Sequence, residues 1–128
     1  MKTEKCSMVY KIVKMHDGKM YSSNPNPQVV DIEAFLENPL QRFVQYRMKH
    51  VTRPKTKGSL IFVCKGRADA ERCAEYFENG GRKSVRILRG YGCNVFKNTI
   101  NGKSKYDITH LPFETYLCDW FVPIGIIK

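Results

Sequence analysis

Residues 60–78 read LIFVCKGRADAERCAEYFE, a continuous apolar run followed directly by an amphipathic pattern. The apolar run, residues 60–64, is typical of a central strand that is covered on both faces. From residue 68 the apolar side chains recur at helical spacing, and Asn79-Gly80-Gly81 ends the pattern. We therefore predict a helix over 68–78 whose buried stripe consists of Ala70, Cys73, Ala74 and Phe77.

Strand signals surround this unit. Residues 8–15 alternate around Val9, Ile12 and Val13, and Asp17-Gly18 accepts the positive φ of a tight turn, so a β-hairpin follows. Residues 43–53 also alternate, which predicts a strand that buries Tyr46, Met48 and His50 and displays its cations. The cations of that strand are Arg47, Lys49 and Arg53.

The remaining segments complete an α+β pattern. A short helix is expected over 30–37, ending before Pro39. Residues 85–88 predict a strand that ends at Gly90-Tyr91-Gly92, and residues 116–127 predict an edge strand interrupted at Pro123. We expect a single compact domain over 1–128, with a mostly antiparallel sheet of five to seven strands and two helices packed against it. Residues 1–7 are predicted to form a flexible N-terminus.

Length and composition agree with one intracellular domain. A chain of 128 residues with 42% hydrophobic residues is large enough to bury a core without metal or disulfide support. The five cysteines are widely spaced, which indicates free thiols in a reducing, cytoplasmic compartment. No apolar run is long enough for a signal peptide or a membrane span.

The charge pattern is the strongest functional signal. The net charge is +10, and two stretches without any Asp or Glu, residues 38–68 and 79–106, hold 15 of the 22 Lys and Arg residues. Aromatic residues such as Tyr46 and Tyr91 lie among these cations, a combination that nucleic-acid surfaces use for phosphates and unpaired bases. The candidate anion-binding residues are Arg42, Arg47, Lys49, Arg53, Lys55, Lys57, Lys65, Arg67, Arg82, Arg86 and Arg89.

Other chemistry has less support. No pair of Cys or His has the spacing of a structural zinc site, so no metal and no cofactor is expected. Cys64 or Cys118 would need a histidine brought near by the fold to act as a nucleophile. Gly90-Tyr91-Gly92 lacks the third glycine of a dinucleotide motif and fits a strand break or bulge. Lys65-Gly66-Arg67 precedes a helix N-terminus, where an anion is favoured.

An enzymatic alternative comes from a resemblance. The run 58–64 and the helix with Tyr76 and Phe77 resemble the strand and helix that follow the NAD pocket of ADP-ribosyltransferases. The resemblance implies an NAD-handling enzyme in which His16, Tyr21 and Glu114 would be the catalytic residues. The family's Ser-Thr-Ser triplet is absent, and Glu114 has no second acid two residues earlier.

We therefore expect a small basic binding module without catalytic activity. Its positively charged sheet face and loops would act on an anionic partner, first RNA or DNA backbone and second an acidic protein surface. Small size and a single domain are typical of accessory or inhibitory proteins of viruses and phages. An NAD- or nucleotide-handling enzyme is the alternative.

Overall fold

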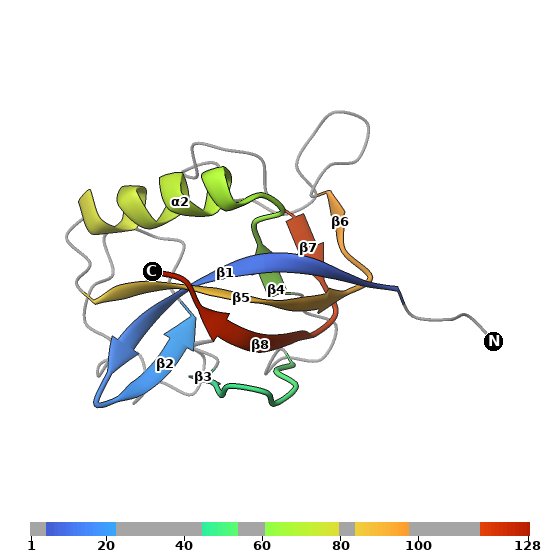
Figure 1. Ribbon diagram of the computed structural model, residues 1–128, viewed down its shortest axis with the longest axis horizontal. Coiled ribbons are helices and arrows are strands. Elements are labelled where there is room, and N and C mark those ends of the chain that lie inside the picture. Colours follow the sequence, from blue (N-terminus) through green and yellow to red (C-terminus); the bar gives the residue numbers. More distant parts are fainter. Residues whose placement is uncertain (1–4, 23–44, 54–60, 80–83, 98–115) are drawn as a thin grey trace, which may run out of the picture.

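The computed structural model describes residues 5–22, 45–53, 61–79, 84–97 and 116–128. These residues form eight strands in two antiparallel sheets and one helix, so the α+β class is confirmed. A single sheet of five to seven strands was expected, and the structure instead has a five-stranded sheet and a second sheet of three strands. The second predicted helix, over 30–37, lies outside the described residues. Figure 1 shows the arrangement of β1 (Cys6–His16), β2 (Lys19–Ser22), β3 (Gln45–Tyr46), β4 (Ile61–Val63), α2 (Arg67–Asn79), β5 (Val85–Cys93), β6 (Phe96–Lys97), β7 (Tyr116–Cys118) and β8 (Phe121–Ile126).

The N-terminal hairpin is confirmed. Strands β1 and β2 pair antiparallel up to His16 and Lys19, and the two turn residues have φ values of 50° for Asp17 and 73° for Gly18. Two positive φ values in a two-residue loop match the twist of the flanking strands. Strand β1 already begins at Cys6, so the last two residues of the segment predicted to be flexible belong to the sheet.

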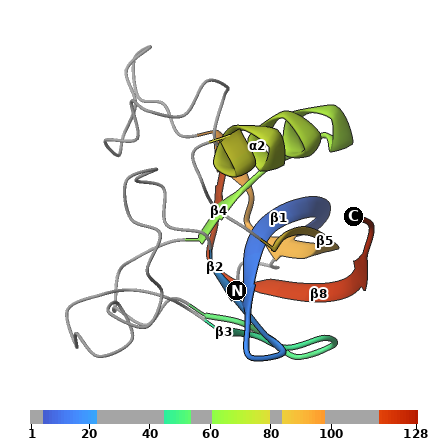
Figure 2. The same ribbon diagram turned by 90° about the vertical axis from the view of Figure 1, so that its left-hand side faces the viewer.

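The larger sheet closes on itself. Its strand order is β3-β2-β1-β5-β8, and the segment after β3 bonds to the outer edge of β8. Thr52 and Phe121 exchange backbone hydrogen bonds of 2.8 and 3.0 Å, and the Lys49 N–H donates to the Pro123 carbonyl at 2.7 Å. The sheet therefore curls into a small barrel, which the end view in Figure 2 shows.

The barrel holds the first core cluster. Nine buried side chains fill it: Val9, Val13, Met20, Tyr46, Ile61, Val63, Leu88, Cys118 and Phe121. The smaller sheet, in the order β4-β7-β6, joins this barrel where Tyr10 and Cys64 exchange two backbone hydrogen bonds of 2.8 Å. Strand β4 is thus an end strand of the smaller sheet, whereas the apolar run predicted a central strand.

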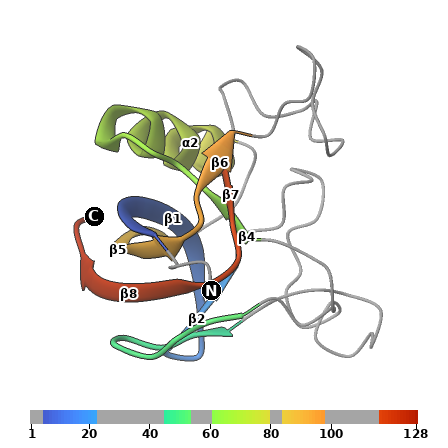
Figure 3. The same ribbon diagram turned by 90° about the vertical axis from the view of Figure 1, so that its right-hand side faces the viewer.

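Helix α2 covers part of the outer face of the barrel. Its buried side chains are the four that the sequence predicts, and they pack against Ile12, Val85 and Ile87 of β1 and β5. Figure 3 shows the helix on this side, opposite the segment around β3. Cys64 and Cys73 lie in the same cluster, and their thiols hydrogen-bond to each other, which lowers the pKa of Cys64 and raises that of Cys73.

Two predicted interruptions are wrong. Strand β5 continues through Gly90 and Gly92, so the predicted break there is wrong, whereas the alternative of a bulge is confirmed between Arg89 and Gly90. A Cβ at Gly90 would overlap the Val122 carbonyl oxygen of β8. Gly90 therefore allows β8 to approach closely and does not end the strand. The break in the last strand falls between β7 and β8, and Pro123 lies inside β8, at the end of the larger sheet's strand order.

Candidate functional site

Residues 45–53 carry three Lys or Arg side chains within nine residues, and we call them the basic segment. Arg47, Lys49, His50 and Arg53 are all exposed, and the segment contains no carboxylate. Arg47, Lys49 and Arg53 form no ion pair with any residue of the described ranges. Within these ranges, no carboxylate competes with an external anion for their charges.

The predicted strand over 43–53 is wrong in this segment. Only Gln45–Tyr46 forms a strand, and a β-turn follows in which the His50 N–H donates to the Arg47 carbonyl at 3.2 Å. Lys49 occupies the third position of this turn with a φ of 63°. The turn is needed because the chain must leave its pairing with β2 and bond to β8 within a few residues.

Although a turn replaces the predicted strand, exposed and buried side chains still follow the predicted pattern, except at His50. Tyr46 and Thr52 are buried, Met48 is half-buried, and Arg47, Lys49 and Arg53 are exposed. His50 was expected to be buried and is exposed. The hydrogen bonds to β8 anchor the segment, so its cations project from a fixed backbone.

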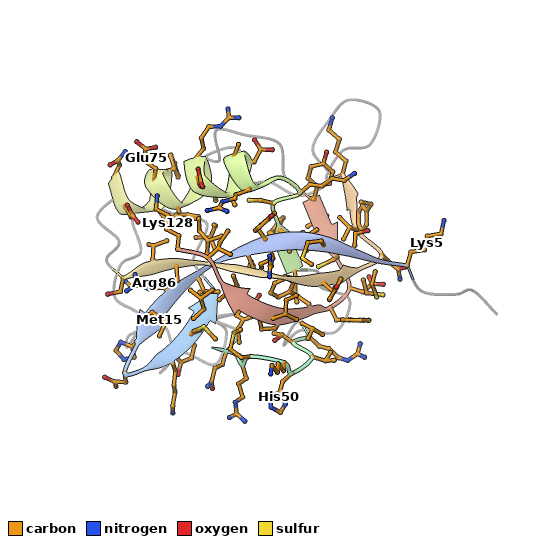
Figure 4. All side chains as sticks on the ribbon, viewed as in Figure 1. Lys5, Met15, His50, Glu75, Arg86 and Lys128 are labelled. Carbon is orange, nitrogen blue, oxygen red and sulfur yellow. The ribbon has the colours of Figure 1, made fainter. Side chains whose placement is uncertain are left out.

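The basic segment lies opposite the acidic surface of α2. The helix carries Asp69, Glu71, Glu75 and Glu78. Two of these acids are paired with arginines of the same helix, Arg67 with Glu71 at 3.1 Å and Arg72 with Asp69 at 3.2 Å. Figure 4 shows Glu75 and His50 on opposite sides of the molecule. Among the described residues, the acidic helix and the basic segment thus lie on opposite sides of the molecule.

The other candidate cations are distributed differently. Arg86 pairs with Val13 in the sheet and Arg89 pairs with Tyr10, so the two arginines lie on opposite faces of β5. Lys65 lies over the Tyr116 ring at 5.5 Å and Arg67 is paired with Glu71, so both cations around Gly66 already have partners. Four candidates lie outside the described residues: Arg42, Lys55, Lys57 and Arg82.

The sequence did not single out Lys11, although its surroundings in the fold are unusual. Lys11 lies on β1 between Val9 and Val13 and points into the barrel, where its side chain is buried. Its ammonium donates to the Phe62 carbonyl at 2.7 Å and lies 5.9 Å from the centre of the Tyr46 ring. Burial lowers the pKa of Lys11, and the thiols of Cys118, Cys64 and Cys73 partly oppose that shift. Its position between two core valines was the only signal in the sequence.

The residues of the enzymatic alternative are placed in part. His16 and Tyr21 face each other across the hairpin, with ring centroids 6.4 Å apart, and His16 Nε2 lies 3.5 Å from the carboxylate of Asp17. Tyr21 is buried. Glu114 lies outside the described residues, so the structure does not bring the three together.

Among the described residues, no group of three or more His, Cys, Asp or Glu side chains could hold a metal ion. In the same ranges, no helix is long and apolar enough to cross a membrane. The five cysteines all lie in the described part of the chain, and none forms a disulfide. No family model, curated protein or solved structure matches this chain.

Proposed function

We infer that this protein is a small binding module without catalytic activity that contacts an anionic partner, nucleic acid in the first place, through the basic segment. The observation that carries the proposal is the exposure of Arg47, Lys49 and Arg53 on a backbone fixed to β8, with no carboxylate among them. Cations held in a fixed arrangement lose less conformational entropy when they bind phosphates than cations on a free tail.

The charge distribution supports a polyanion over a small anion. The side chains of Arg47, Lys49 and Arg53 are all exposed, and they are distributed over residues 47–53. Several exposed cations close together in the chain can contact more than one of the repeating phosphates of a nucleic acid. The net charge of +10 adds long-range attraction toward such a partner.

Salt dependence of binding tests the proposal. A labelled oligonucleotide is titrated with the full chain, and binding is followed by fluorescence anisotropy at two salt concentrations. Three phosphate contacts should weaken binding about fortyfold between about 50 and 200 mM salt, because each contact releases condensed counterions. Absence of binding at the lower salt concentration, together with binding to an acidic polypeptide, would assign the segment to a protein partner instead.

A further inference from the structure

On the outer face of the barrel, apolar side chains line up across four chain segments. Met8 of β1 is paired with Tyr91 of β5, and Tyr91 is paired with Val122 of β8. Because Thr52 is bridged antiparallel to Phe121, Val51 lies opposite Val122 in the same register. We call the four residues Met8, Tyr91, Val122 and Val51 the outer row.

Three of the four residues of the outer row are exposed, and Val122 is half-buried. Tyr91 is 43% exposed, Met8 37% and Val51 53%, although each is large and hydrophobic. Helix α2 covers the neighbouring part of the same face, where Ile12, Val85 and Ile87 are buried beneath it. The row thus begins where the helix no longer covers the sheet.

Cations flank the outer row on both sides. Arg89 precedes Tyr91 by two residues and therefore lies on the same face of β5, with Tyr10 opposite it on β1. Arg53 follows Val51 by two residues in the basic segment and is also exposed. A strip with an exposed aromatic ring in its middle and a guanidinium on each side fits a chain that alternates flat bases with phosphates.

The dimensions of the row favour a single nucleic-acid strand over a protein as its partner. Four neighbouring segments at about 4.8 Å spacing give a strip about 14 Å long and one side chain wide. A stable protein–protein interface buries about 800 Å² on each partner, which a strip of four side chains does not provide. An unpaired nucleic acid segment needs only such a narrow track.

We propose that the outer row is the base-stacking surface for single-stranded nucleic acid, with Tyr91 as the stacking residue and Arg89 and Arg53 on the adjoining phosphates. This proposal rests on the proposed function, because the basic segment supplies one end of the row. It adds a preference for unpaired over duplex nucleic acid, since a paired base does not offer its face to a tyrosine.

The test compares a labelled single strand with a blunt duplex of the same length, as DNA and as RNA. The full-length wild-type chain should bind the single strand at least tenfold more tightly than the duplex. Tyr91→Ala should remove about tenfold of the single-strand affinity, as loss of one base–aromatic stack predicts. Tyr91→Phe keeps the ring and should bind as the wild type does.

Two further variants keep the test decisive if Tyr91→Ala is poorly folded. Val51→Glu places a carboxylate at the end of the row and should lower single-strand affinity. Ile126 lies outside the row and is 53% exposed, as Val51 is, so Ile126→Ala should leave affinity unchanged.

The outcomes separate this proposal from the proposed function. Equal, salt-dependent binding of strand and duplex that Tyr91→Ala does not alter would overturn the stacking surface and leave the basic segment as a backbone-binding site. Lack of binding to either ligand would overturn both. Self-association of the wild type that Tyr91→Ala abolishes would also overturn the proposal and assign the row to a second copy of the chain.

Discussion

The basic segment and Lys11 place the same kind of charge in opposite surroundings. Arg47, Lys49 and Arg53 lie in solvent, where an ammonium or guanidinium keeps its hydration and costs the fold little. Lys11 lies inside the barrel, where one carbonyl and one aromatic ring replace the water around its amine. The first group can act on a partner, and the second acts on the stability of the protein itself.

The difference teaches that net charge alone says little about a binding surface. Lys11 counts toward the +10 of the chain but faces the first core cluster, while the cations of α2 are paired with acids of the same helix. Only charges that are exposed, unpaired and positioned by fixed backbone contribute to a site for a polyanion. Among the described residues, the basic segment best meets these three conditions.

The largest effect should follow from reversing the charge of the basic segment. The triple variant Arg47→Glu, Lys49→Glu and Arg53→Glu should lose at least about a hundredfold in nucleic-acid affinity at low salt, and its salt slope should fall by about 2.7. The melting temperature should change little, because exposed charges contribute little to stability. Anisotropy titrations and thermal melts measure both quantities.

Arg86→Glu is the matched control for this charge reversal. Arg86 is exposed but lies outside the basic segment, on the face of β5 opposite to that of Arg89. It should lose only the part of the affinity that comes from net charge. Equal losses for this variant and for each single variant of the segment would show that binding follows overall charge, and the distinction between the segment and the rest of the surface would then fail.

Lys11→Met should produce a smaller effect, on stability, that depends on pH. The folded pKa of Lys11 is lowered from its usual 10.5, so the unfolded chain takes up the proton first as pH falls. The wild type should therefore lose stability relative to Lys11→Met as pH falls from about 10.5 through the folded pKa, by about 1.4 kcal/mol for each unit of lowering.

Urea unfolding of both chains at neutral pH and near pH 10.5 measures this difference. Loss of the hydrogen bond to Phe62 costs the variant about 1 kcal/mol at every pH, so the change between the two pH values is the informative quantity. A stability difference that stays constant with pH would mean that Lys11 is as well solvated as the exposed cations, and the comparison would lose its basis.

Local rules predicted the parts of the fold that local contacts determine. The hairpin at Asp17 and Gly18 and the buried stripe of α2 follow from turn geometry and helical spacing, which need only neighbouring residues. The strand over 43–53 failed because its end is positioned by β8, about 70 residues further along the chain. Sequence spacing does not contain that pairing.

The candidate site shows the same limit. The sequence marked Arg47, Lys49 and Arg53 through their alternation and the absence of acids, and the structure leaves all three exposed. It did not mark Met8, Val51 or Val122, because the outer row exists only through the registers of β1, β5, β8 and the basic segment. It also treated Lys11 as one more cation, although the apolar neighbours on either side predict an inward position.

The smallest effect should come from Lys49 itself, which has a left-handed φ of 63° in the turn of the basic segment. Asparagine accepts this conformation more readily than lysine, so Lys49→Asn should stabilise the fold by about 0.5–1 kcal/mol, or about 2–4 °C in melting temperature. The same change removes one cation and should weaken nucleic-acid binding severalfold.

Arg53→Asn is the matched control, because Arg53 is exposed in the same segment and has no positive φ. It should show the loss of affinity without the gain in stability. If Lys49→Asn were instead less stable than the wild type, the lysine side chain would contribute to holding the turn, and the segment would resemble Lys11 in acting on the fold as well as on a partner.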